Sequence, residues 1–309
     1  MKLKYGFLIL VFFLQPFITS ACDICGCGVG SYYVGILPDF KKRFIGLRYQ
    51  HKSLITHLNA AGGRSYLTTD ETYHIAELWG AVNIGKKFRV MGFIPYNCNQ
   101  RLNQGVTTSQ NGFGDVAAYG YYKLLDGRTV TKNKKLLIHS LWVGAGLKLP
   151  TGSYNNTDKN VVENIQNTFQ LGTGSTDVVL NAMYDLRLQD AGINTNMSYK
   201  INTANKYNYR YGNKFTTNLL AYYKIRLGKN GTLAPNTGVL YEQAAKDSKQ
   251  NNHTVEESGG YSLTHTTGIE WSFKRLSWGA NFQVPIEQRL AEAKVKSQNR
   301  LMIHVSVSL

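Results

Sequence analysis

The sequence predicts an all-β protein: a transmembrane, up-and-down antiparallel β-barrel of about 12 strands that follows a cleaved signal peptide. One observation is composition, because the 309 residues are 43% hydrophobic and 12% aromatic, yet the mean hydropathy is −0.27. A second is that many segments alternate apolar and polar residues with a period of two, as strands with two different faces do. A third is that the connections between these segments are alternately short and long.

Composition and charge exclude several other classes of protein. The chain is too apolar and aromatic to be disordered, and nothing beyond residue 20 is an uninterrupted apolar stretch of about 20 residues, as a membrane-spanning helix requires. The net charge is +16, from 35 basic and 19 acidic residues. The basic residues lie in predicted turns and at strand ends rather than in a stripe, which favours anionic lipid or solute over nucleic acid.

The N-terminus has the layout of a secretory signal peptide. Met1–Lys4 carries positive charge, Phe7–Leu14 is apolar, and Thr19–Ala21 supplies small residues at the expected cleavage site. A retained transmembrane helix is the alternative, but the apolar run is too short to cross a bilayer. We therefore predict that residues 1–21 are removed on export.

A segment rich in Cys and Gly, residues 22–41, follows as a periplasmic or plug segment. It holds Cys22, Cys25 and Cys27 in a C-x-x-C-x-C pattern. Outside the cytoplasm a disulfide is the default use of such cysteines, and Ser20–Cys22 also resembles the end of a lipobox, which would make Cys22 a lipid anchor. The same spacing suits a soft metal ion such as copper or zinc. No other cofactor is expected.

The barrel is expected over residues 42–309. In its last segment Leu301, Ile303 and Val305 share one face, whereas Met302 and His304 share the other. Twelve segments follow this rule, and most are longer than the five or six residues usual in globular sheets. They are approximately 42–51, 72–84, 87–95, 112–125, 135–149, 175–188, 191–202, 214–227, 231–244, 258–273, 276–285 and 297–309.

The connections distinguish a membrane barrel from a soluble β-sandwich. Outer-membrane barrels join their strands by short periplasmic turns and long outer loops, and a sandwich has no reason to do so. An even number of strands places both termini on the periplasmic side. The predicted short connections are 85–86, 126–134, 189–190, 228–230 and 274–275. The predicted long connections are 52–71, 96–111, 150–174, 203–213, 245–257 and 286–296.

Three short motifs carry a resemblance to a known family. They are Gly112–Asp115, Lys148–Gly152 and Gly172–Asp177, and they open or close three consecutive predicted strands. In this order and spacing they resemble the bacterial outer-membrane family named for the MetA pathway of phenol degradation, whose members are channel-like β-barrels. The resemblance covers about residues 42–309. It implies an outer-membrane transporter of a Gram-negative bacterium.

The same motifs predict a charged trio at one rim of the barrel. By strand parity Asp115, Lys148 and Asp177 all point inward at the same end, with Lys148 between the two carboxylates. Opposite charges on neighbouring strands fix register. We favour the interpretation that the trio pins the sheet at this end, and the alternative is that it shapes a pore constriction.

No catalytic constellation is present, and we predict that the chain is not an enzyme. The leading hypothesis is a porin-like channel for passive passage of small solutes, including aromatic or weakly anionic ones. The alternatives are an outer-membrane protein that handles copper or zinc through its N-terminal cysteines, or a structural barrel without transport. Expected partners are outer-membrane lipid, the solute and the barrel-assembly machinery, with no nucleic acid. The predicted pore-lining residues are Glu77, Tyr119, Tyr121, Trp142, Asn181, Asp185, Arg187, Lys200, Lys224, Arg226 and Glu270.

Overall fold

The computed structural model describes residues 43–309 except 60, 133, 156–167 and 250–252. The predicted signal peptide and the segment 22–41, including Cys22, Cys25 and Cys27, lie outside the described residues. Within them, no helix is long and apolar enough to cross a membrane.

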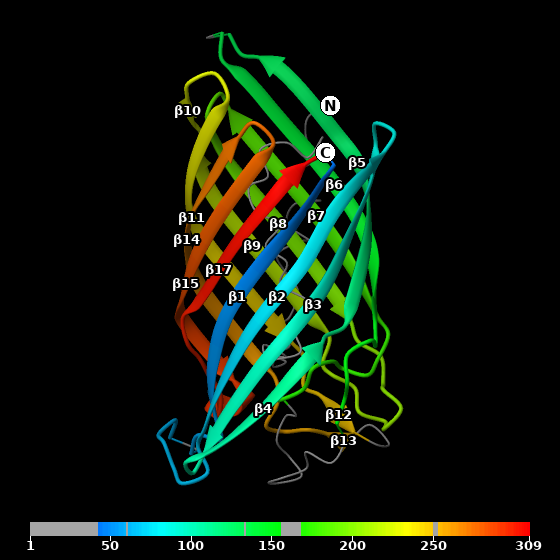
Figure 1. Ribbon diagram of the computed structural model, residues 1–309, viewed down its shortest axis with the longest axis vertical. Helices are drawn as coiled ribbons and strands as arrows, with labels where there is room; N and C mark the ends of the chain where they lie inside the picture. The colour runs from blue at the N-terminus through cyan, green and yellow to red at the C-terminus, as the bar shows by residue number, and fades with distance from the viewer. Residues whose placement is uncertain (1–42, 60, 133, 156–167, 250–252) are drawn as a thin grey trace, which may run out of the picture.

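The predicted antiparallel barrel of 12 strands is confirmed (Figure 1). Each long strand pairs with its neighbours along the chain. Closure comes from the pairing of the last strand with the first, β17 with β1. The barrel strands are β1 (Phe44–Thr56), β2 (Thr69–Ile84), β3 (Phe88–Asn103), β4 and β5 (Val106–Phe113 and Val116–Val130), β6 (Leu136–Leu149), β7 (Asp177–Leu188), β8 (Ala191–Ile201), β9 and β10 (Lys214–Tyr223 and Ile225–Leu227), β11 (Gly231–Ala244), β14 (Gly260–Phe273), β15 (Leu276–Leu290) and β17 (Arg300–Ser308).

The two ends of the barrel differ in their connections. At one end, here called the turn end, short turns join β2 to β3, β5 to β6, β7 to β8, β10 to β11 and β14 to β15, and the C-terminus lies there (Figure 1). The opposite end is called the loop end. It carries the longer connections, which contain the short pair β12 (Ser248–Lys249) and β13 (His253–Thr254), the turn η2 (Ala291–Ala293) and β16 (Lys296–Ser297).

One predicted loop was wrong: residues 96–111 form a hairpin. Strand β3 continues to Asn103, and β4 pairs with it from Val106 onward. Gln104 and Gly105 between them have φ values of 49° and 79°. Positive φ at both central residues is the mark of a two-residue type I′ turn, whose twist matches that of the strands. The hairpin was missed because its residues are polar on both faces.

The outer face carries apolar side chains between two aromatic pairs. Phe88 lies 5.0 Å from Tyr122 near the turn end, and Tyr96 lies 5.3 Å from Phe113 nearer the loop end, as distances between ring centroids. Phe88 and Tyr96 are eight residues apart on β3, which is about 27 Å along the strand at 3.4 Å per residue. Because the strands of such barrels are tilted by about 40°, this length corresponds to about 21 Å along the barrel axis, close to the apolar band of about 25 Å that outer-membrane barrels present to lipid.

Candidate functional site

One side of the barrel interior is aromatic. Strands β2, β3, β5, β6 and β7 turn large side chains inward, and these pack into one cluster that contains Trp79, Phe93, Tyr119, Tyr121 and Trp142. Phe93 lies 5.5 Å from Tyr119 in an edge-to-face contact. The rings lie close to the sheet because glycines face them: a Cβ at Gly146 would overlap the ring of Tyr119. We call this side the aromatic wall.

The opposite side of the interior is polar. Strands β8, β9, β11, β14, β15 and β17 turn amides, hydroxyls and a few charged groups inward. Asn194, Asn218, Asn236 and Asn281 are all buried on these strands, and so are Thr264, Thr266 and Ser306. Glu270 Oε2 lies 3.1 Å from His304 Nε2. We call this side the amide wall, and the barrel therefore encloses an interior with two chemically different sides.

The predicted pore-lining residues fall on both walls and at the turn end. Tyr119, Tyr121 and Trp142 belong to the aromatic wall, and Glu77 is buried in an ion pair with Arg48. Lys200 and Glu270 are buried on the other side of the barrel. Asn181 is partly buried on β7, and Asp185 accepts a 2.9 Å hydrogen bond from the hydroxyl of Tyr222. Arg187, Lys224 and Arg226 line a cavity at the turn end. Their roles in transport stay predictions.

The trio of Asp115, Lys148 and Asp177 is assembled at the loop end. Lys148 Nζ lies 2.7 Å from Asp115 Oδ2 and 2.7 Å from Asp177 Oδ2. All three side chains are at most 1% exposed. Their charged groups are covered by one another and by the connection that follows β6, and this mutual cover supports the role of a pin. The constriction role stays a prediction.

The trio also holds the connection between β6 and β7, residues 150–176. Asp115 accepts hydrogen bonds from the backbone N–H groups of Gly152 and Thr173, at 3.0 and 2.8 Å. Lys148 Nζ donates to the hydroxyl of Thr173. Asp177 accepts from the hydroxyl of Ser175 at 2.9 Å. These bonds attach both described ends of the connection to the barrel wall.

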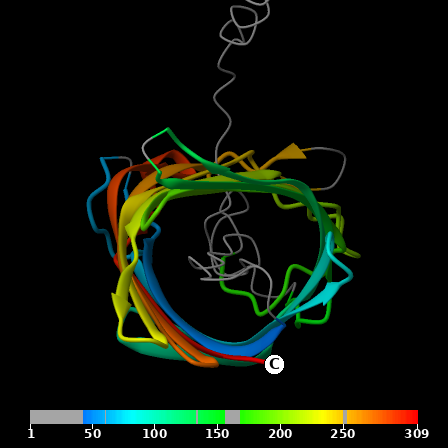
Figure 2. The same ribbon diagram turned by 90° about the horizontal axis from the view of Figure 1, so that it is seen from above.

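From this anchor the segment Thr168–Thr173 turns into the barrel and lies against the inner faces of β2 and β3 (Figure 2). Asn97 Nδ2 donates to Leu171 O at 3.0 Å, and Asn99 Nδ2 donates to Gln170 O at 3.2 Å. Thr168 Oγ1 donates to Glu71 Oε2 at 2.8 Å. Side chains of the wall thereby satisfy the backbone of a segment that has no regular secondary structure. We call Thr168–Thr173 the latch.

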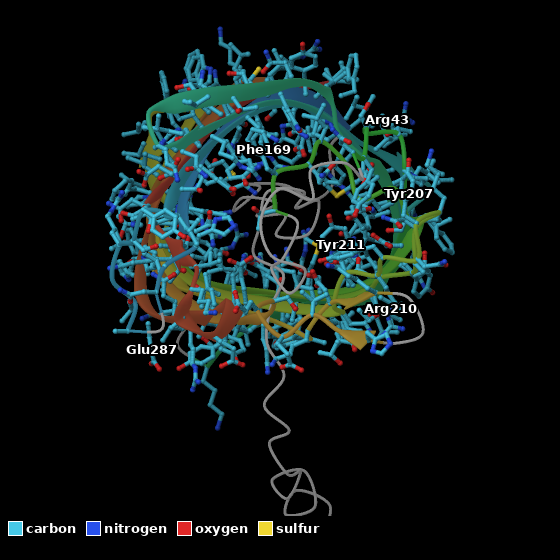
Figure 3. The ribbon with its side chains drawn as sticks, turned by 90° about the horizontal axis from the view of Figure 1, so that it is seen from below. Arg43, Phe169, Tyr207, Arg210, Tyr211 and Glu287 are labelled. Carbon is cyan, nitrogen blue, oxygen red and sulfur yellow. The ribbon has the colours of Figure 1, made fainter. Side chains whose placement is uncertain are left out.

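Phe169 is the apolar centre of the latch. Its side chain is 0% exposed, lies inside the ring of strands (Figure 3) and packs with Leu54, Tyr73 and Leu290. The guanidinium carbon of Arg101 lies 4.2 Å from its ring centroid, and Arg101 also pairs with Glu71 at 3.1 Å. The latch occupies part of the interior at the loop end, and the side chain of Phe169 fills the space between the latch and the barrel wall.

Sequence reasoning missed several of these residues. Trp79 has the same strand parity as Glu77, and the four amide-wall asparagines alternate with outward apolar residues, so the periodicity could have identified them. Phe169 carried no such signal, because it lies in a connection without a period.

The other loops at this end are joined by surface ion pairs. Lys246 contacts Glu256 at 2.5 Å and Glu292 at 3.2 Å. The hydrogen bond from Lys246 lowers the pKa of Glu292, and the hydrogen bond to Glu256 raises the pKa of Lys246. Within the described part of the chain, no group of three or more His, Cys, Asp or Glu residues is placed to hold a metal ion. The predicted soft-metal site at the N-terminal cysteines stays a prediction.

Comparison with solved structures places this architecture among bacterial outer-membrane barrels. The COG4313 outer membrane channel from Pseudomonas putida F1 superposes with a TM-score of 0.62 at 14% identity, covering 91% of this chain and 100% of that one. The β domain of the Bordetella autotransporter BrkA gives 0.51 at 11% identity, covering 87% and 100%. The CymD monoaromatic hydrocarbon channel gives 0.40 at 9% identity, covering 87% and 88%.

None of the curated proteins compared with the chain is similar to it in sequence. A family model does match, over residues 56–289, and its description is "Putative MetA-pathway of phenol degradation". The match covers most of the barrel, including the three motifs and the latch, and so the resemblance is confirmed: the chain belongs to this family of outer-membrane β-barrels.

Proposed function

We propose that the protein is a passive outer-membrane channel for small solutes that combine an aromatic ring with a polar or weakly anionic group. The observation that carries this proposal is the division of the interior into an aromatic wall and an amide wall. A solute between them places its ring against Trp142 and its polar group against amides and hydroxyls. Family membership and the fold of the Pseudomonas channel support it, and nothing in the described residues nominates a catalytic centre.

The orientation and export of the chain belong to the same proposal. The loop end faces the outside and the turn end faces the periplasm, because outer-membrane barrels carry their short turns on the periplasmic side. Residues 1–21 are a signal peptide, and the barrel-assembly machinery inserts the exported chain. A metal role for Cys22, Cys25 and Cys27 is tested separately, by comparing the metal content of the purified protein with that of a triple Cys→Ser variant.

The aromatic wall offers a direct test. Trp142 lines a cavity of about 320 Å³ together with Asn83 and Lys123. In planar bilayers we expect the wild-type protein to conduct ions and phenol to block the current in a concentration-dependent way. We expect Trp142→Ala to weaken the block about fivefold, since an aromatic pair contributes about 1 kcal/mol beyond its buried area.

Trp278→Ala is the matched control for this test. Trp278 is 37% exposed on the outer face and lies 4.6 Å from Trp271, so its loss does not alter the interior. Phenol should block this variant as it blocks the wild-type protein. Absence of any conductance would contradict the channel, and equal block in all three proteins would contradict the role of the aromatic wall.

A further inference from the structure

The turn end of the barrel contains a cavity of about 610 Å³ whose lining is strongly basic. Six cationic residues line it: Lys134, Arg187, Lys224, Arg226, Lys229 and Lys274. Among the lining residues Asp190 is the one acid, and it already pairs with Arg226 at 3.1 Å. Much of the remaining lining consists of small polar residues such as Thr232, Ser272 and Ser306. We call this cavity the basic vestibule.

The position of these charges follows from the topology. Four of the five short turns contribute a cation to the vestibule, from β5–β6, β7–β8, β10–β11 and β14–β15, or from strand residues beside them. A closed barrel brings these turns onto one ring, although they are spread over about 140 residues of sequence from Lys134 to Lys274. Cations converging on a low-dielectric mouth concentrate small anions there.

The vestibule also has an aromatic side. Phe44 is part of its lining and is 6% exposed, and its ring lies 4.6 Å from that of Trp79 in an edge contact. The aromatic wall therefore extends as far as the basic lining. The volume is within the range of about 300 to 1,000 Å³ that is usual for small-molecule sites.

From this juxtaposition we propose that the basic vestibule is a binding site for aromatic carboxylates, and that it makes the channel selective for anions. The carboxylate lies among Lys224, Lys229 and Lys274, and the ring lies against Phe44. This inference rests on the proposed channel function and specifies its substrate class. It involves no covalent step, only reversible attraction of the anion.

Two triple variants with the same net charge distinguish the effect of the lining cations from the effect of positive charge anywhere at the turn end. The lining triple is Lys224→Gln, Lys229→Gln and Lys274→Gln. The control triple is Lys87→Gln, Lys135→Gln and Arg275→Gln, which removes three cations at the same end from residues outside the lining. Because none of these six residues lies in the buried cluster of the aromatic wall, both variants are expected to fold.

The first measurement is the reversal potential in a potassium chloride gradient across a planar bilayer. We expect chloride to permeate better than potassium through the wild-type protein. The permeability ratio of chloride to potassium should fall several-fold in the lining triple and change little in the control triple. The difference in this ratio between the wild-type protein and the lining triple should shrink as the salt concentration rises from 0.1 to 1 M, since the screening length falls from about 10 to about 3 Å. Equal shifts in the two triples, or cation preference in the wild-type protein, would overturn the proposal.

The second measurement is titration of benzoate into the detergent-solubilised protein, with benzyl alcohol as the neutral analogue. We expect benzoate to bind more tightly than benzyl alcohol, with a several-fold loss of affinity in the lining triple alone. Benzoate binding that is equal in all three proteins would overturn the site. Because this titration requires no ion current, a protein that binds benzoate but does not conduct would contradict the channel function and leave the site standing.

Discussion

Replacing Lys148 by Met is expected to destabilise the barrel by about 3–5 kcal/mol, the usual cost of removing one partner from a buried ion pair. Lys148 is 0% exposed and lies 2.7 Å from each of two carboxylates. Methionine fills similar space but leaves Asp115 and Asp177 facing each other in a covered site. The expected result is a lower guanidinium midpoint of unfolding in detergent micelles, measured as the loss of the β-sheet circular dichroism signal.

A second substitution distinguishes lost charge from lost packing. In the double variant Lys148→Met with Asp177→Asn, a single carboxylate remains, and Asp115 keeps its bonds from Gly152 N, Thr173 N and Thr173 Oγ1. We expect this variant to recover part of the lost stability, because residues in one network are not additive. A double variant no more stable than Lys148→Met would show that charge is not the cause.

Lys206→Met is the control for a cation at the same end. Lys206 is exposed and its ammonium lies 5.1 Å from the ring centroid of Tyr207. Changes at such surface positions usually alter stability by about 0.5 kcal/mol or less. If Lys148→Met unfolded at the same midpoint as Lys206→Met, the trio would not be a pin.

The strands and the trio were predictable from sequence for one physical reason. A membrane barrel has lipid on one side and an enclosed interior on the other, so every spanning strand must alternate. Counting residues along three consecutive strands then placed Asp115, Lys148 and Asp177 at one rim, facing inward. Parity is local information, and a single sequence contains it.

The latch and the ends of the strands required information that parity does not contain. In this stretch of β3 the outer face carries polar residues such as Gln100, and the inner face also carries polar residues such as Asn99, which bonds to the latch. Residue type therefore does not alternate there, and the hairpin resembled a loop. The latch that carries Phe169 is held by side chains of β2 and β3, about 70 to 100 residues earlier in the chain. Such contacts exist only once the barrel has closed.

Replacing Phe169 by Ala is expected to release the latch and raise the single-channel conductance. The ring is 0% exposed among Leu54, Tyr73 and Leu290, and truncation of a buried phenylalanine costs about 3–5 kcal/mol. Since the strands of the barrel remain paired, this cost acts mainly on the docked position of Thr168–Thr173. A loss of about 3 kcal/mol shifts the equilibrium between docked and undocked latch by roughly a hundredfold.

The increase should be seen in planar bilayers as a larger mean conductance, with slower or fewer closures than in the wild-type protein. Arg101→Gln should act in the same direction, because it removes the 4.2 Å contact with the ring and the ion pair with Glu71, which accepts the hydrogen bond from Thr168. In both variants the guanidinium midpoint of the barrel should change less than in Lys148→Met.

Phe113→Ala is the control that separates the latch from the loss of any phenylalanine at this end. Phe113 is 62% exposed on the outer face and lies 5.3 Å from Tyr96, away from the interior. Its conductance should equal that of the wild-type protein. If Phe169→Ala conducted no better than Phe113→Ala while both folded normally, then the docked latch would not limit the passage of ions, and the narrowest point of the channel would have to lie deeper, between the aromatic and amide walls.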